Sequence, residues 1–138
     1  NGTFDTMQNT AVRYLHHSYP IEEMVALYLA ADVMLVTALR DGMNLVAKEY
    51  VTARTNNDGA LVLSEFAGAA DQLKQALLMN PHDIDGLKDT IMRAVNMQPA
   101  EAARRMRAMR KQILTNDVDL WSADFLSALQ EKVVRDDS

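Results

Sequence analysis

The sequence contains no cysteine among its 138 residues, and this absence removes several classes of protein from consideration. Without cysteine there is neither a disulfide framework nor a thiolate metal site. The net charge is -5, whereas a nucleic-acid-binding domain usually presents a basic face. No apolar run approaches the roughly 20 residues of a membrane span, and the amino-terminal segment NGTFDTMQNT does not have the pattern of a signal peptide. We therefore expect a cytoplasmic protein that binds neither nucleic acid nor membrane.

Common ligand-binding motifs are missing as well. Neither GxGxxG nor GxxxxGK[ST], the two glycine motifs that hold phosphates, occurs in the chain. His16 and His17 are adjacent, so in a strand they point to opposite faces and do not bind one metal together. The chain begins at Asn1 rather than at methionine, which leads us to expect a piece of a longer protein.

The hydrophobic pattern predicts strands that alternate with helices. We expect strands at residues 11–19, 33–38 and 60–65, and a short strand LLMN that ends a helix beginning at Gly68. The other expected helices are residues 21–31, 44–54, 81–97, a helix from Pro99, and residues 116–134. This alternation is typical of one α/β domain with a mostly parallel sheet and helices on both faces.

Several details of this pattern can be compared with a structure. The run VMLVTA, residues 33–38, is typical of a strand buried on both faces. Pro20 is expected in the first turn of its helix with Ser18 as cap, and Asp83 or Asp85 is expected to begin helix 81–97. We interpret the basic run ARRMRAMRK as a solvated face and most of the nine methionines as core residues.

The stretch ALRDGMN follows the second strand, and ligands of open α/β sheets lie at the carboxyl ends of strands. Asp41 and Gly42 allow a tight turn, because glycine accepts a positive φ without steric cost. Free N–H groups from about Gly42 to Leu45 can hold an anion such as a phosphate. Glu49 lies about one turn into the next helix, where its carboxylate can accept hydrogen bonds from two ribose hydroxyls.

A plainer interpretation of the same residues stays open. Asp41 and Gly42 form a turn, Asn44 caps the helix, and Lys48 and Glu49 face water. The segment SEFAGAADQL after the third strand has the same ambiguity, because its small residues allow either a ligand or a packed helix to approach the backbone. HHSYP after the first strand is the third strand end at which a ligand is expected.

Three segments carry a family resemblance. LYLAADVMLVTALRDGMNLVAKEYVTAR, LVLSEFAGAADQL and LLMNPHDIDGL closely resemble the trehalose-6-phosphate synthases, from about Tyr14 to Phe125. The pairing of SEFAGAA with NPHDIDG is similar to actinobacterial forms. One departure is Ala38, where the family usually has proline, and it affects no contact residue.

The resemblance implies a GT-B glycosyltransferase with two Rossmann-like domains. Residues 1–138 would form part of the carboxyl-terminal nucleotide-sugar-binding domain, with final helices at about 99–134, and the amino-terminal acceptor domain would be absent. The implied reaction moves glucose from UDP-glucose to glucose 6-phosphate with retention of configuration, and gives trehalose 6-phosphate and UDP. It needs neither metal nor cofactor, and the full-length enzyme is expected to be a homo-oligomer.

The resemblance also implies a set of donor-binding residues. Tyr19 would lie by the uracil ring, and Glu49 would hold the ribose hydroxyls. The donor glucose would contact the four residues Asp41, Gly42, Met43 and Asn44. The diphosphate would meet Leu45 and Val46 at the helix N-terminus, and Ala47 and Lys48 belong to the same donor-binding segment.

Parts of the family's site are missing from this chain. The Arg and Lys that the family places on the donor phosphates would lie in a segment before Asn1, so we expect the isolated chain to be inactive. By the family's strand order the chain would hold the outer third strand and the fourth to sixth strands. The first and second strands, which lie between the third and the fourth in the sheet, would be absent. Unpaired apolar edges would result. A non-catalytic fragment that self-assembles, or a GT-B enzyme with another acceptor, therefore remains an alternative.

Overall fold

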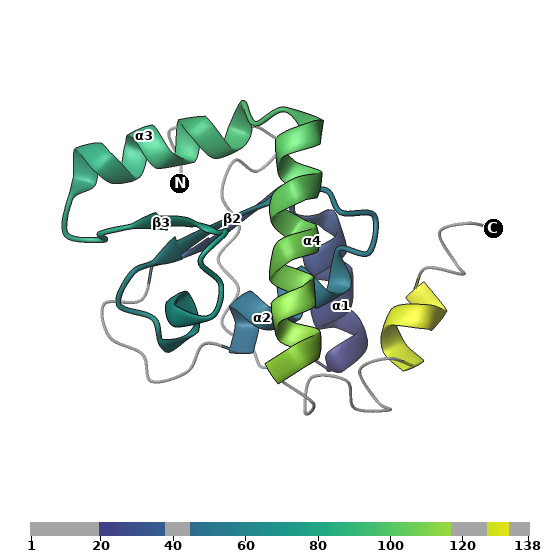
Figure 1. Ribbon diagram of the computed structural model, residues 1–138. Helices are drawn as coiled ribbons and strands as arrows, with labels where there is room; N and C mark the ends of the chain where they lie inside the picture. Colours follow the sequence, from purple (N-terminus) through teal and green to yellow (C-terminus); the bar gives the residue numbers. More distant parts are fainter. Residues whose placement is uncertain (1–19, 38–44, 117–126, 133–138) are drawn as a thin grey trace, which may run out of the picture.

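The computed structural model describes residues 20–37, 45–116 and 127–132 (Figure 1). Its elements are α1 (Ile21–Ala30), β1 (Val33–Val36), α2 (Leu45–Ala53), β2 (Ala60–Ser64), the 3-10 turn η1 (Gly68–Asp71), β3 (Leu77–Met79), α3 (Ile84–Val95) and α4 (Pro99–Asn116). Residues 127–132 are also helical. The strand expected at residues 11–19 and the first part of the helix expected at 116–134 lie outside the described residues.

The three strands form a parallel sheet in the order β1-β2-β3. Val33 pairs with Ala60, and Val62 pairs with Leu77. The expected α/β fold with a parallel sheet is therefore confirmed. Since the strands run in one direction, their carboxyl ends Val36, Ser64 and Met79 lie along one edge of the sheet, which we call the carboxyl edge. The opposite side, where the strands begin, is the amino edge.

Helices cover both faces of this sheet, as the alternation predicted (Figure 1). On one face, Leu61 and Leu63 of β2 join a core with side chains of α1, α2 and α4. On the other face, α3 packs its Ala94 against Val62 and Leu77. Alternation of the strand side chains between these two cores explains why all five residues of β2 are buried.

Two expectations about the strands and helices are wrong. Leu35 of β1 is 42% exposed and only Val36 of that strand is buried, because β1 is an edge strand in the described sheet. The helix expected from Gly68 is a single 3-10 turn, after which the chain extends into β3. Ala69 and Ala70 are buried in the core, and this packing of the short turn overrides the helix propensity of the residues that follow.

The structure shows which residues begin α3 and α1. Asp83 is the N-cap of α3, and its Oδ1 accepts a hydrogen bond of 3.0 Å from the Gly86 N–H. Pro20 occupies the N-cap position of α1 rather than its first turn. The expected cap Ser18 lies outside the described residues.

The basic run on α4 is only partly a solvated face. Arg104 and Arg107 are exposed, but Arg110 is half-buried and its guanidinium reaches α2. It donates to the carbonyl oxygens of Val51 and Arg54 and to Oδ1 of Asn57. Met106 and Met109 of the same helix are buried, as expected for core methionines. Arg110 therefore fastens α4 to the carboxyl-terminal end of α2.

Candidate functional site

The N-terminus of α2 lies at the carboxyl edge of the sheet. The helix begins at Leu45, the next described element after β1, and it ends at Ala53 before the turn into β2. α2 therefore runs from the carboxyl edge toward the amino edge, and its N-terminus lies at the edge where ligands of parallel sheets bind. Leu45 and Val46 in its first turn are exposed. This placement is the one that the sequence predicted for an anion site.

The next three side chains of α2 have different surroundings. Ala47 and Lys48 are fully buried, while Glu49 is half-buried. The plainer interpretation, in which Lys48 and Glu49 both face water, is therefore wrong for Lys48. The helix exposes Leu45 and Val46 at its start and buries Ala47 and Lys48 directly after them.

The remaining predicted donor residues lie outside the described residues. These are Tyr19, Asp41, Gly42, Met43 and Asn44. Their roles, and the way in which they meet α2, stay predictions.

Burial raises the pKa of the Glu49 carboxyl above its ordinary value. A half-buried carboxylate loses part of its hydration, so a ligand that supplies hydrogen-bond donors to it is favoured. The pKa of Tyr28 on α1 is also raised, first by burial and then by the negative charge of Glu49. Tyr28 lies in the helix that the sequence predicts at residues 21–31, and no pattern in the sequence indicates its electrostatic link to Glu49.

The segment after β2 supports α2 from the side. Ser64 is buried and its Oγ accepts a hydrogen bond of 3.1 Å from the Phe66 N–H. Ala67, Ala69 and Ala70 are buried in the core that includes α2, and η1 contacts that helix. The small residues of SEFAGAA therefore serve close packing, which was one of the two interpretations left open.

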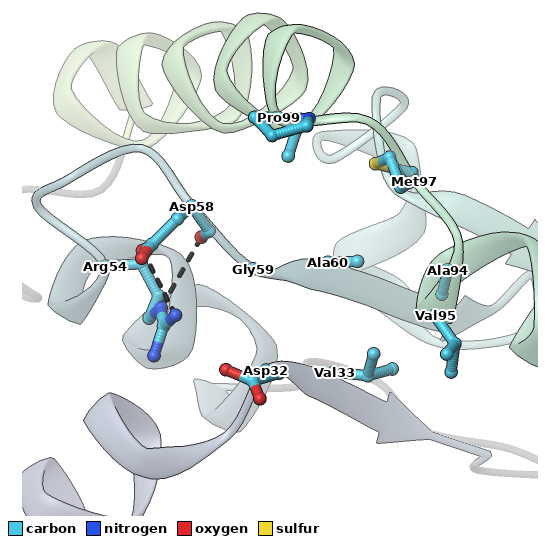
Figure 2. Close-up of a pocket in the computed structure, with 11 residues that line it drawn as sticks. Asp32, Val33, Arg54, Asp58, Gly59, Ala60, Ala94, Val95, Met97 and Pro99 are labelled. Carbon is cyan, nitrogen blue, oxygen red and sulfur yellow. Dashed lines mark hydrogen bonds and ion pairs between the residues drawn. The ribbon is translucent and has the colours of Figure 1, made fainter.

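A hollow of about 430 Å³ lies at the amino edge, away from the N-terminus of α2 (Figure 2). Its lining includes Asp32, Val33 and Ala60 from the start of β1 and β2. Arg54 on its wall forms an ion pair of 3.1 Å with Asp58 and donates to the Leu29 carbonyl oxygen at 2.6 Å. These contacts engage the guanidinium in holding the turn and the end of α1. Among the described residues, its lining includes none of the predicted donor residues.

Two kinds of feature are absent from the part of the chain that the structure describes. No group of three or more His, Cys, Asp or Glu residues there could hold a metal ion. No helix there is long and apolar enough to cross a membrane.

Comparison with known proteins agrees with this arrangement. The parallel sheet, the helices on both faces and the helix N-terminus at the carboxyl edge define part of a Rossmann-like domain of a GT-B glycosyltransferase. Residues 1–131 match the model of glycosyltransferase family 20. The chain belongs to glycosyltransferase family 20.

Three relatives show how this chain compares with members of the family. A trehalose-6-phosphate synthase of Mycobacterium leprae is 57% identical over 136 residues, which is 99% of this chain and 27% of that relative. The solved synthase of Burkholderia xenovorans, in complex with glucose-6-phosphate, is 46% identical with a TM-score of 0.81. The match covers 94% of this chain and 29% of that one.

A trehalose-6-phosphate structure from E. coli, bound with UDP-2-fluoro glucose, has a TM-score of 0.80 and 43% identity, covering 94% of this chain and 29% of that one. The chain thus spans little more than a quarter of the length of these relatives.

Proposed function

We propose that this chain supplies part of the donor site of a retaining glucosyltransferase. The full reaction breaks the bond between the anomeric carbon of UDP-glucose and the diphosphate, and forms a bond from that carbon to an oxygen of glucose 6-phosphate. The products are trehalose 6-phosphate and UDP. Membership in family 20, together with solved relatives that bind glucose-6-phosphate and UDP-2-fluoro glucose, supports this proposal.

The observation that carries the proposal is the N-terminus of α2 at the carboxyl edge of a parallel sheet. A helix N-terminus stabilises an anion through its unpaired N–H groups and its dipole. In this proposal Leu45 and Val46 meet the diphosphate there, and the buried residues Ala47 and Lys48 anchor the turn that presents them. Backbone donors at this position stabilise the charge that develops on the departing diphosphate.

The other donor contacts follow along the chain. Glu49 accepts hydrogen bonds from the two ribose hydroxyls, and Tyr19 lies by the uracil ring. Asp41, Gly42, Met43 and Asn44 contact the donor glucose. Residues 1–138 then form part of the nucleotide-sugar domain, with the acceptor bound by an amino-terminal domain of the full-length enzyme. We place that enzyme in the cytoplasm, as a homo-oligomer.

A chimera tests this proposal directly. The 138 residues replace the matching 136 residues of the Mycobacterium leprae synthase, and UDP release is measured with UDP-glucose and glucose 6-phosphate. We expect the chimera to turn over and the isolated chain to show no turnover, because the chain spans only 27% of that relative. A folded chimera without activity would contradict the proposal.

Substitution of Glu49 in the chimera tests its assigned contact. Glu49→Gln removes the charge but keeps the shape, so we expect the KM for UDP-glucose to rise about tenfold, the effect of losing a hydrogen bond to a charged group. Exposed Glu65 at the end of β2 offers a matched control, and Glu65→Gln should leave the KM unchanged.

A further inference from the structure

The hydroxyl group of Tyr28 is an unusual polar atom in the core. The residue is 1% exposed, and the hydroxyl has no hydrogen-bond partner among the described residues. Burial of an unpaired hydroxyl destabilises a fold, and phenylalanine would fill the same space without that cost. Tyrosine therefore gives the free protein no stability beyond what phenylalanine would give at this position. This points to a use of the hydroxyl in the ligand-bound protein.

Tyr28 packs against the part of α2 that carries Glu49. The ring of Tyr28 packs edge-on against the ring of Tyr50, with centroids 6.4 Å apart and planes at 73°, and Tyr50 directly follows Glu49 in α2. α1 and α2 pack against each other, and the buried Tyr28 side chain lies in the core that the two helices share.

Electrostatics agree with this geometry. Glu49 is the charged group that raises the pKa of Tyr28, after burial itself. Glu49 is also half-buried, so its carboxylate has lost part of its water shell and needs a donor to hold one orientation.

We propose that Tyr28 is a positioning residue for Glu49. When the donor nucleotide is bound, the Tyr28 hydroxyl donates a hydrogen bond to the Glu49 carboxylate and leaves its remaining lone pairs to the ribose hydroxyls. This inference rests on the proposed function of Glu49 as the ribose-binding residue. It predicts that one buried hydroxyl lowers the stability of the free protein and tightens the binding of the ribose.

The neighbouring Tyr50 is a matched control. It is equally buried, but its hydroxyl donates to the Ala31 carbonyl oxygen at 2.7 Å, on the amino-edge side of the helices. The same substitution therefore removes a satisfied hydrogen bond in Tyr50→Phe and an unsatisfied hydroxyl in Tyr28→Phe.

Thermal unfolding of the full chain is the first measurement. We expect Tyr28→Phe to leave Tm unchanged or to raise it by about 3 °C, and Tyr50→Phe to lower it by a similar amount. If Tyr28→Phe lowers Tm as Tyr50→Phe does, the Tyr28 hydroxyl has an acceptor in the free protein and the inference is overturned.

The second measurement compares UDP-glucose with 2′-deoxy-UDP-glucose in the chimera described above. We expect the unsubstituted chimera to have a roughly tenfold lower KM for the ribose form. Tyr28→Phe should reduce this preference to about threefold at unchanged kcat, and Tyr50→Phe should leave it intact. Adding Tyr28→Phe to Glu49→Gln should cause no further loss, because the two residues act as one unit.

The outcomes separate this inference from the proposed function. If Glu49→Gln removes the ribose preference but Tyr28→Phe does not change it, only the role of Tyr28 is overturned. If Glu49→Gln also leaves the preference intact, the ribose contact of Glu49 fails, and the role of Tyr28 fails with it.

Discussion

At the scale of single residues, neighbours decide what a charged side chain does. Arg107 and Arg110 are three positions apart in one basic run, yet Arg107 is exposed and Arg110 is half-buried against α2. Sequence analysis assigned both to a solvated face, because the pattern of α4 does not show which arginine meets the end of another helix. Only the packing of α4 on α2 separates them.

Arg110 should therefore be important for stability. Arg110→Met keeps the apolar stem but leaves the carbonyl oxygens of Val51 and Arg54 and the Asn57 side chain without their donor. We expect the free energy of unfolding to fall by about 2 kcal/mol, since partly buried acceptors lose their hydrogen bonds. Urea denaturation measures the change. Arg107→Met on the exposed side should stay within about 0.5 kcal/mol, and equal losses in the two variants would contradict this role.

At the scale of elements, the turn between α2 and β2 depends on a glycine. Gly59 has a φ of +84°, a region that L side chains rarely adopt. A Cβ there would lie 2.4 Å from the Tyr50 hydroxyl oxygen, whose hydrogen bond to Ala31 joins the ends of α1 and α2. The turn, the tyrosine and the two helix ends are therefore one unit.

Gly59→Ala tests this unit. We expect a loss of about 3 kcal/mol in the free energy of unfolding, from the strained φ and the displaced Tyr50 hydroxyl together. Asp58→Ala is the control in the same turn, because Asp58 is 59% exposed and its ion pair should contribute less than about 1 kcal/mol. Equilibrium denaturation of both variants checks the difference, and a Gly59→Ala loss no larger than that of the control would rule out the coupling.

The elements also show what a sequence can predict. Periodicity located α1, α2, α3, α4 and the three described strands, because each has a strong apolar pattern with clear turn residues between them. It failed at Gly68, where propensity favoured a helix but the need to bury Ala69 and Ala70 beside α2 limited the chain to one turn. It also failed at Lys48, whose charge indicated solvent although the helix turns it into the core.

At the scale of the whole molecule, the site was easier to predict than its surroundings. The position of α2 at the carboxyl edge follows from the strand-loop-helix order alone, so the sequence located it. The electrostatic link between Tyr28 and Glu49 depends on how two helices pack, and no local pattern carries that information. The exposure of β1 likewise depends on which strands lie beside it, which is a property of the sheet and not of the run VMLV.

The last prediction concerns the lateral side of the sheet that is formed by β1. β1 is an edge strand of the described sheet, and its Leu35 is 42% exposed. An apolar side chain on an unpaired edge strand favours pairing with another chain. We therefore expect the isolated 138-residue chain to associate as its concentration rises, as the self-assembly alternative requires.

Leu35→Lys distinguishes association through the β1 strand from nonspecific association through other exposed apolar side chains. A charge on an edge strand opposes edge-to-edge pairing, so sedimentation or light scattering should show a smaller apparent mass than for the unsubstituted chain. Leu114→Lys, at a 56% exposed leucine of α4, is the matched control and should leave association unchanged. A chain that is monomeric at every concentration, or that responds equally to both substitutions, would show that the β1 edge does not drive assembly. The same edge in the chimera should be inert, because the other three quarters or so of the synthase supply whatever normally covers it.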